Sequence, residues 1–250
     1  MIEMTFDVED LSVSAKNGKD ILNGVTFSLP DGGVHVIMGP NGSGKSTLAL
    51  TLAGSPDFVV KSGKIEFDGI DLLSLGADER AKKGLFMAFQ KQVEIPGVPL
   101  KDMIWEAYRV RWSGPGRPSI IDFRKKLSAT ASMLSFPETF LERGVNEGFS
   151  GGEGKKSEVL QMLMLQPKLA ILDEVDSGLD VDSLRVVADA IKRFVEDGHS
   201  ALIITHHFDL LNYIEPDVVY VMKGGKIVDE GDITLARIIE REGYSRWGGE

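Results

Sequence analysis

A glycine-rich run near the N-terminus has the spacing of a phosphate-binding loop. Residues 39–46 read Gly-Pro-Asn-Gly-Ser-Gly-Lys-Ser, and a threonine follows. Glycines let successive backbone N–H groups turn toward phosphate oxygens, and the N-terminus of a following helix adds a favourable dipole. We expect Lys45 to neutralise the β- and γ-phosphates of a nucleotide and the Ser46 hydroxyl to bind Mg²⁺. The predicted nucleotide-binding residues of this run are Gly39, Pro40, Asn41, Gly42, Ser43, Gly44, Lys45, Ser46 and Thr47.

Two adjacent carboxylates follow an apolar run farther along the chain. Leu169–Leu172 are apolar, and Asp173 and Glu174 come next. Ligands of open α/β sheets bind at the carboxyl ends of the strands, which is where this pair falls. We expect Asp173 to hold the Mg²⁺ shell and Glu174 to orient or deprotonate an attacking water. A solvated acidic turn is the alternative for this pair. For Asp176 and Asp180, metal binding is the alternative, and solvated loop carboxylates are expected.

The elements that must position these residues read as strands alternating with helices. A helix is expected from about Lys45 to Ala53 and another from Leu235 to Tyr244. The alternation predicts an α/β fold with a mainly parallel sheet that is covered on both faces, preceded by an antiparallel β part. The segments predicted as strands are residues 4–8, 24–29, 34–38, 63–69, 85–89, 169–172, 201–205 and 218–222.

The stretch between residues 91 and 165 has a different character. Its periodicity is helical, with breaks at Pro96-Gly97, Gly114–Pro118 and Pro137. We therefore expect an inserted helical subdomain at 91–165 and an ATP-binding α/β core made of residues 1–90 and 166–250.

These motifs, taken in order, resemble those of the ATP-binding-cassette (ABC) family. Phe149-Ser-Gly-Gly-Glu153 is similar to the family signature and precedes a helical run. The resemblance implies that Ser150, Gly151 and Gly152 contact the γ-phosphate of a nucleotide bound to the opposite subunit. A hydroxyl and unobstructed amides at a helix N-terminus suit an anion. The family therefore implies a P-loop ATPase that dimerises when it binds ATP.

Three further elements are assigned by the same resemblance. Gln90 is similar to the glutamine of the family's Q-loop, which senses Mg²⁺ and the γ-phosphate. Ser177–Asp180 is similar to the D-loop, which crosses the dimer interface. His206 is similar to the switch histidine, with His207 as the competing candidate. The catalytic residues implied are thus Glu174, His206, Lys45 and Gln90, and the metal-binding ones are Ser46, Gln90 and Asp173. The aromatic residue that often stacks on adenine is missing between positions 13 and 21, and Val13 is the apolar substitute considered.

A narrower resemblance is to the ATPases of the Suf iron–sulfur cluster assembly system. It rests on the sequence between and around the general motifs. Two acidic residues, Glu153 and Asp176, point most strongly to the Suf ATPases. Val175 and Gly154 depart from the expected pattern. The resemblance implies a role in driving SufB- and SufD-like scaffold proteins, with ATP and Mg²⁺ as cofactors. It also implies docking near the Q-loop, where Ile95, Pro96, Val98 and Leu100 offer apolar surface; local packing of a loop is the alternative. The segments that carry this resemblance are 87–90, 93–98, 148–153, 160–162 and 173–180.

Composition limits the other functional classes. The 250 residues hold 28 Lys and Arg against 38 Asp and Glu, so a net charge of −10 argues against a general nucleic-acid binder. No apolar run approaches the roughly 20 residues of a membrane-spanning helix, so we expect a soluble, cytoplasmic protein without direct membrane insertion. The absence of cysteine excludes Cys-ligated metal in this chain, so any cluster would sit mainly on a partner.

Two alternatives stay open. A nucleotide-binding subunit of a membrane ABC transporter shares all the general motifs and would be recovered with an integral-membrane partner. A non-hydrolysing, nucleotide-dependent interaction module belongs to a different class. The presence of Asp173, Glu174 and His206 argues against it, and an assay of phosphate release separates it from an ATPase.

Overall fold

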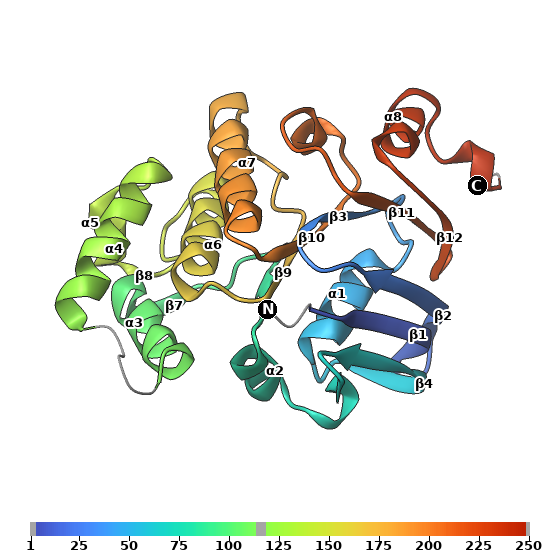
Figure 1. The fold of residues 1–250 in the computed structure, drawn as a ribbon, viewed down its shortest axis with the longest axis horizontal. Helices are drawn as coiled ribbons and strands as arrows, with labels where there is room; N and C mark the ends of the chain where they lie inside the picture. The colour runs from blue at the N-terminus through green and yellow to red at the C-terminus, as the bar shows by residue number, and fades with distance from the viewer. Residues whose placement is uncertain (1–3, 114–118, 249–250) are drawn as a thin grey trace.

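The computed structural model describes residues 4–113 and 119–248 of the chain (Figure 1). Its main feature in those ranges is a six-stranded sheet in the order β12-β11-β3-β10-β9-β6. Only the edge pair β11 and β12 is antiparallel, and the other neighbours run parallel. The mainly parallel sheet is therefore confirmed. Its strands are β3 (Gly33–Met38), β6 (Leu85–Ala88), β9 (Leu169–Asp173), β10 (Ser200–Thr205), β11 (Val218–Lys223) and β12 (Lys226–Gly231).

Both faces of the inner strands of this sheet are buried. Within β3, Val36 and Met38 pack into one hydrophobic cluster while Ile37 packs into the other. Neighbouring residues of β10 divide in the same way, with Ile203 on one face and Ile204 on the other. A strand covered on both sides has no solvent-facing positions, which explains why these segments appear as unbroken apolar runs.

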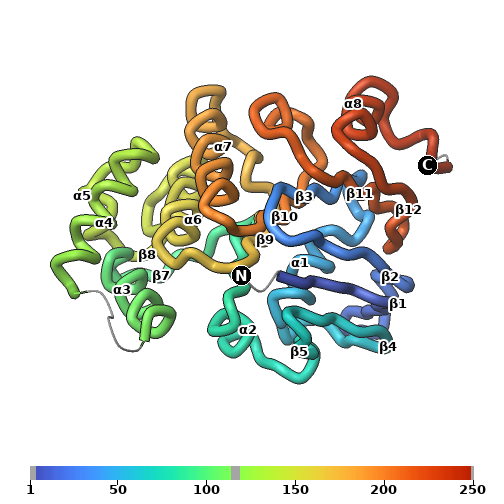
Figure 2. Tube along the Cα trace, viewed as in Figure 1, coloured from blue at the N-terminus to red at the C-terminus, as the bar shows by residue number. Residues whose placement is uncertain are grey.

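A second, antiparallel sheet is formed mostly by the N-terminal segments. Its order is β2-β1-β4-β5, and Figure 2 shows β5 beside β4. The strands extend well beyond the predicted segments because polar residues such as Glu9 and Asp10 lie on the exposed side or in bulges of β1. The antiparallel β part is confirmed, with longer strands than expected. They are β1 (Phe6–Ala15), β2 (Asp20–Leu29), β4 (Phe58–Phe67) and β5 (Ile70–Asp71).

The region between residues 91 and 165 is mostly helical, and Figure 1 shows its helices gathered beside the large sheet. The break at Pro96-Gly97 is an extended segment that pairs with β8, whereas Gly114–Pro118 lies outside the described residues. Leu100 is fully buried, so its expected place on a docking surface is wrong. The division into core and inserted subdomain stays a prediction. The elements are β7 (Ile95–Pro99), α3 (Leu100–Arg111), α4 (Ile120–Met133), α5 (Glu138–Leu141), β8 (Gly144–Val145) and α6 (Gly151–Leu165).

Helices cover the two faces of the large sheet. Leu48 of α1 belongs to the cluster shared with the antiparallel sheet, whereas Ile191 of α7 and Ile239 of α8 belong to the opposite one. In the described residues, no helix has both the length and the apolar character needed to cross a membrane. The remaining elements are α1 (Lys45–Ala53), η1 (Leu72–Ser74), α2 (Ala77–Lys83), α7 (Val181–Glu196), η2 (Asp209–Asn212), α8 (Ile233–Glu242) and η3 (Ser245–Trp247).

Candidate active site

The phosphate-binding loop joins the carboxyl end of β3 to the first turn of α1. Gly42 and Gly44 have φ angles of 80° and 105°, which side chains rarely adopt. A Cβ atom on Gly39 would lie 2.2 Å from the backbone oxygen of Met222. The glycines are thus required by local geometry, and the loop curves around the N-terminus of a helix, as an anion site demands.

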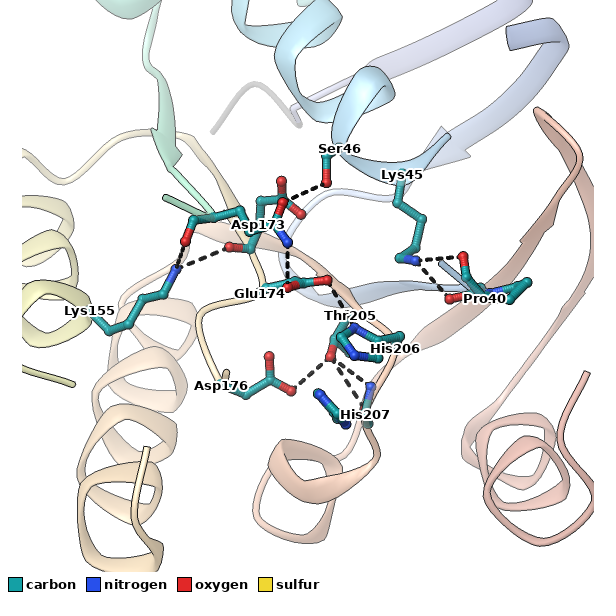
Figure 3. Close-up of polar contacts among 12 residues, drawn as sticks. Pro40, Lys45, Ser46, Lys155, Asp173, Glu174, Asp176, Thr205, His206 and His207 are labelled. Atoms are coloured by element: carbon teal, nitrogen blue, oxygen red, sulfur yellow. Dashed lines mark hydrogen bonds and ion pairs between the residues drawn. The ribbon is translucent and has the colours of Figure 1, made fainter. Parts of the chain in front are cut away.

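Lys45 is buried at the start of α1 and bends back over this loop. Its Nζ donates to the backbone oxygens of Gly39 and Pro40 at 2.7 and 3.1 Å (Figure 3). Burial lowers the pKa of Lys45, while the negative charges of Glu174 and Asp173 oppose that shift. A phosphate in the loop would give the ammonium charge-assisted partners, which are stronger than neutral carbonyls.

Oxygen atoms from three elements meet where a metal ion would be expected. Ser46 Oγ donates to Gln90 Oε1 at 3.4 Å. Asp173 Oδ1 is buried without a hydrogen-bond partner in the described part of the chain. Burial raises the pKa of Asp173 to about 6, although a hydrogen bond from Ser46 acts to lower this pKa. Such an oxygen set fits Mg²⁺, which binds one or two carboxylates together with phosphate oxygens and water.

The metal would depend on the nucleotide as well as on the protein. Within residues 4–113 and 119–248, no group of three or more His, Cys, Asp or Glu side chains could hold a metal ion by itself. Mg²⁺ usually retains substrate phosphates and water rather than a closed protein cage. The donor set of Ser46, Gln90 and Asp173 therefore suits a metal that arrives with a bound triphosphate.

Glu174 occupies the centre of the polar network in Figure 3. Its Oε2 accepts from Gln90 Nε2 at 2.7 Å, and its Oε1 lies 2.9 Å from Nδ1 of His206. Its backbone has a φ of 50°, and such left-handed non-glycine residues cost on the order of 1–3 kcal/mol. The backbone N–H donates to Ile204 O at 2.8 Å, which holds the turn. The nearly buried carboxylate is thus fixed by two side chains and can act on a water in the cleft.

The two adjacent histidines have different surroundings. His206 contacts Glu174, whereas the backbone N–H of His207 donates to Thr205 Oγ1 at 3.0 Å and its side chain is exposed. The centroids of the two rings are 3.7 Å apart. The geometry therefore brings His206, rather than its neighbour, to the carboxylate that was predicted to handle water.

Some of the site residues line a cleft of about 260 Å³, whereas Asp173 and His206 are not among its lining residues. Most of the predicted phosphate-handling side chains reach it, but Val13 is buried in the core and cannot pack on a nucleotide base, so that expectation is wrong. Ile21 reaches the cleft instead, from the start of β2, which lies outside the segment predicted as a strand. The lining residues are Ile21, Asn41, Gly42, Gly44, Lys45, Ser46, Thr47, Gln90 and Glu174.

The signature segment lies elsewhere, at the start of α6. Ser150 Oγ accepts from the backbone N–H of Glu153 at 3.3 Å, and the backbone N–H of Ser150 donates to Glu153 Oε2 at 2.7 Å. This reciprocal capping box explains the acidic residue in the signature. Ser150 and Gly151 are exposed and do not line the cleft described above. One chain therefore presents these donors outward instead of assembling them with its own phosphate loop.

The two carboxylates that follow Glu174 differ from each other. Asp176 is buried and accepts from Thr205 Oγ1 at 2.8 Å, and burial raises its pKa, so the expectation of a solvated side chain is wrong. Asp180 is exposed and caps α7 by accepting from Ser183 N at 2.7 Å. Asp176 thus ties the segment after Glu174 to the end of β10, just before His206.

Comparisons with known proteins identify the family of this chain. Residues 22–177 match the family described as ABC transporter. The chain is 47% identical over 239 residues to the probable ATP-dependent transporter SufC of Escherichia coli K12, covering 95% of this chain and 96% of the relative. It is 46% identical over 246 residues to the probable ATP-dependent transporter ycf16 of Pyropia yezoensis, covering 98% of each.

Solved structures give the same fold. A dimeric bacterial ABC transporter cassette superposes with a TM-score of 0.79 at 22% identity, covering 91% of this chain and 98% of that one. The ADP conformation of an ABC transporter's ATP-binding cassette has a TM-score of 0.75 at 26% identity, covering 100% of both. The chain belongs to the ATP-binding-cassette family and is an ATPase, with SufC among its similar relatives.

Proposed function

We propose that this ATPase transfers the γ-phosphoryl group of ATP to water in a site shared by two copies of the chain. The observation that carries the proposal is the hydrogen-bonded set Gln90, Glu174 and His206 beside the phosphate loop. Glu174 aligns the water and accepts its proton as the bond from water oxygen to the γ-phosphorus forms and the bond to the β–γ bridging oxygen breaks, with ADP as the leaving group. His206 keeps the carboxylate oriented and hydrogen-bonds the γ-phosphate.

The phosphate loop supplies charge and orientation. Its backbone N–H groups and Lys45 hold the β- and γ-phosphates, and Ser46, Gln90 and Asp173 are the residues that would hold Mg²⁺. When bound, the metal neutralises charge that develops on the phosphate oxygens. Positioning and electrostatic stabilisation, rather than covalent chemistry by the protein, carry most of such a reaction.

The second copy supplies the signature donors. Ser150, Gly151 and Gly152 stand at the N-terminus of α6, away from the cleft of their own chain. A facing subunit would place them on the opposite side of the γ-phosphate. ATP then contacts both subunits, so binding favours closure and hydrolysis permits opening.

The proposed biological role is to drive a SufB- and SufD-like scaffold during iron–sulfur cluster assembly in the cytoplasm. The supporting observations are the similarity to SufC and the absence of cysteine, which leaves cluster ligation to a partner. Ile95 and Val98 are exposed near the Q-loop, together with Pro96, and Figure 1 shows their strand β7 beside the helices. A separate cavity of about 420 Å³ is lined mainly by α2, β6 and α3, including Ala81, Phe86 and Val110. These surfaces offer a scaffold segment an apolar site.

Recovery of the tagged protein from its native cells without detergent, followed by mass spectrometry, tests the role. The proposal predicts cysteine-containing scaffold proteins resembling SufB and SufD as the main partners. A tagged Val98→Asp variant should recover less of them, while a Val228→Asp variant, changed at an exposed valine of β12, should recover the parental amount. A membrane-spanning protein as the main partner, recovered only with detergent, would contradict the Suf role.

Recovery of a membrane-spanning partner would support the alternative function, a nucleotide-binding subunit of a membrane ABC transporter. The observation favouring it is the wording of the relatives' names, which call them transporters or transporter ATP-binding proteins. The ATPase chemistry is the same in both cases, and only the partner differs.

A further inference from the structure

The Q-loop backbone, residues 89–92, rests against the second and third turns of α6. Glu158 Oε1 accepts from the backbone N–H of Phe89 at 2.9 Å, and its Oε2 accepts from Gln92 Nε2 at 3.0 Å. The Glu158 side chain is 5% exposed, so neither bond is replaced by water at little cost. A single carboxylate thus fixes both ends of this short segment.

Lys155, one turn earlier on the same helix, holds the carbonyl side of the segment. Its Nζ donates to Phe89 O at 2.8 Å and to Gln90 O at 3.0 Å, and it lies 3.5 Å from Asp173 O. Burial lowers the pKa of Lys155 and raises that of Glu158, as expected for charges held away from water. Lys155 and Glu158 together hydrogen-bond to both donors and acceptors of residues 89–92, and these bonds restrain that segment.

Gly154 provides the room for this contact. A Cβ atom at this position would lie 3.2 Å from Cγ of Gln92, closer than side chains normally approach. The Gln92 amide also donates to Phe89 O at 3.2 Å, so displacing Gln92 would disturb the same backbone group that Lys155 holds. A residue with a side chain at position 154 would therefore press on Gln92.

We propose that Gly154, Lys155 and Glu158, which we call the Q-loop seat, are positioning residues that set Gln90 against Glu174. The proposal rests on the function proposed above for Gln90. α6 begins just after Ser150, and Gly154 follows about 6 Å along the helix axis. Because Lys155 and Glu158 hold the Q-loop backbone, a displacement of α6 on contact with a second subunit carries the Q-loop with it. The seat therefore links the signature of one half-site to the Gln90 of the other.

The sharpest test is Gly154→Ala, because its methyl group presses on Gln92 without weakening the helix. Alanine favours a helix by about 1 kcal/mol over glycine. We expect kcat for ATP hydrolysis to fall about tenfold while KM for ATP changes less than about twofold, because the phosphate loop is untouched. The midpoint of thermal unfolding should stay the same or rise. A purely structural role for the seat predicts no loss of kcat at all, and that result would overturn the proposal.

A double-mutant cycle adds a second readout. Gln92→Ala removes the side chain against which the methyl group of the Gly154→Ala variant would press, so Gly154→Ala should lower kcat no further in that background. Additive losses of kcat would contradict the steric link. Glu158→Ala should also lower kcat selectively, whereas Gln161→Ala, in the next turn of the same helix, removes a side chain that bonds to Ser157 and should match the parent.

Gln90→Ala, measured in parallel, separates the role proposed for Gln90 from the role proposed for the Q-loop seat. If it hydrolyses ATP at the parental rate, both the role proposed for Gln90 and the seat proposal fail. If Gln90→Ala is slow but the seat variants retain the parental kcat, only the seat proposal fails. Slow turnover in both sets, with unfolding midpoints at or above the parental value for Gly154→Ala, is the predicted result.

Discussion

The region around Glu174 and the N-terminus of α6 differ in how complete they are within one chain. Glu174 is 7% exposed, and two side chains hold its carboxylate. Ser150 is exposed, and its side-chain oxygen accepts from the backbone of Glu153 in the same helix. One region has its chemistry already assembled, whereas the other presents its donors outward.

The difference shows what each region is built to do. The buried network carries destabilising features, including a left-handed Glu174 and a desolvated Asp173, that the rest of the core must support. The signature end contains a well-formed capping box. Strained backbone of the kind seen at Glu174 clusters at active sites, and the N-terminus of a helix such as α6 is suited to bind an anion.

The largest effect should come from Glu174→Gln, which breaks the buried region while retaining its shape. We expect kcat to fall by about 100-fold or more, as for the loss of a general base. MgATP affinity should stay within a few-fold, since the phosphate loop is intact, and a closed dimer should accumulate. Phosphate release and equilibrium nucleotide binding check this, and an unchanged turnover rate would remove Glu174 from the mechanism.

Ser150→Phe should break the exposed region instead. We expect hydrolysis to fall on the order of 100-fold because a bulky side chain blocks the signature donors from the facing phosphate. Binding of nucleotide to the isolated chain should be unchanged, because Ser150 does not line its cleft. Titration with a fluorescent ATP analogue measures that affinity; a parallel loss of affinity would place Ser150 in the site of its own chain.

Asp173→Asn should show, through the free energy of unfolding, that the buried region around Glu174 carries a destabilising charge. The pKa of Asp173 rises from 3.8 to about 6 in the folded chain. The native state therefore holds a proton that the unfolded state has released, so stability falls as pH rises through that window. At pH 7 in EDTA, we expect the variant to be more stable by up to about 3 kcal/mol, at ~1.4 kcal/mol per unit.

At about pH 3, below both pKa values, this pH-dependent difference between Asp173→Asn and its parent should vanish, because the aspartate is mostly protonated in both states. The variant should hydrolyse ATP very slowly at every pH. Urea unfolding at the two pH values gives the comparison. A variant that is less stable than the parent at pH 7 would show that Asp173 is not strained by its burial.

The smallest effect should come from Glu153→Ala at the start of α6. Loss of the capping box should reduce the free energy of unfolding by about 1 kcal/mol, or lower the unfolding midpoint by roughly 2–4 °C for a domain of this size. Glu240→Ala, on an exposed part of α8, serves as the control and should leave the midpoint in place. Equal midpoints for both variants would contradict the capping role.

Local patterns predicted part of this structure well. The α1 helix follows directly from the glycine loop, and β3, β9 and β10 follow from apolar runs that only a doubly covered sheet explains. The edge strand β12 was missed because its residues alternate between exposed and half-buried positions and include a turn-like Asp229. The cleft residues of the phosphate loop were found because their motif is contiguous, whereas Ile21 was missed.

Contacts between distant segments were not predictable in the same way. Glu158 reaches Phe89 across 69 positions, and Lys155 reaches it across 66, so neither leaves a local pattern. Asp176 was misread because its partner, Thr205, belongs to a neighbouring strand. Such burial depends on which strands become neighbours, and sheet order is a property of the whole fold.

Mixing two inactive variants tests the composite site most directly. A dimer of Ser150→Phe with Glu174→Gln contains one half-site in which both the intact Glu174 and the intact Ser150 are present. We predict that the mixture, prepared before ATP is added, hydrolyses ATP at least about tenfold faster than either variant alone, approaching roughly a quarter of the parental rate. A mixture no faster than the mean of the two variants would contradict the claim that two chains share each catalytic site.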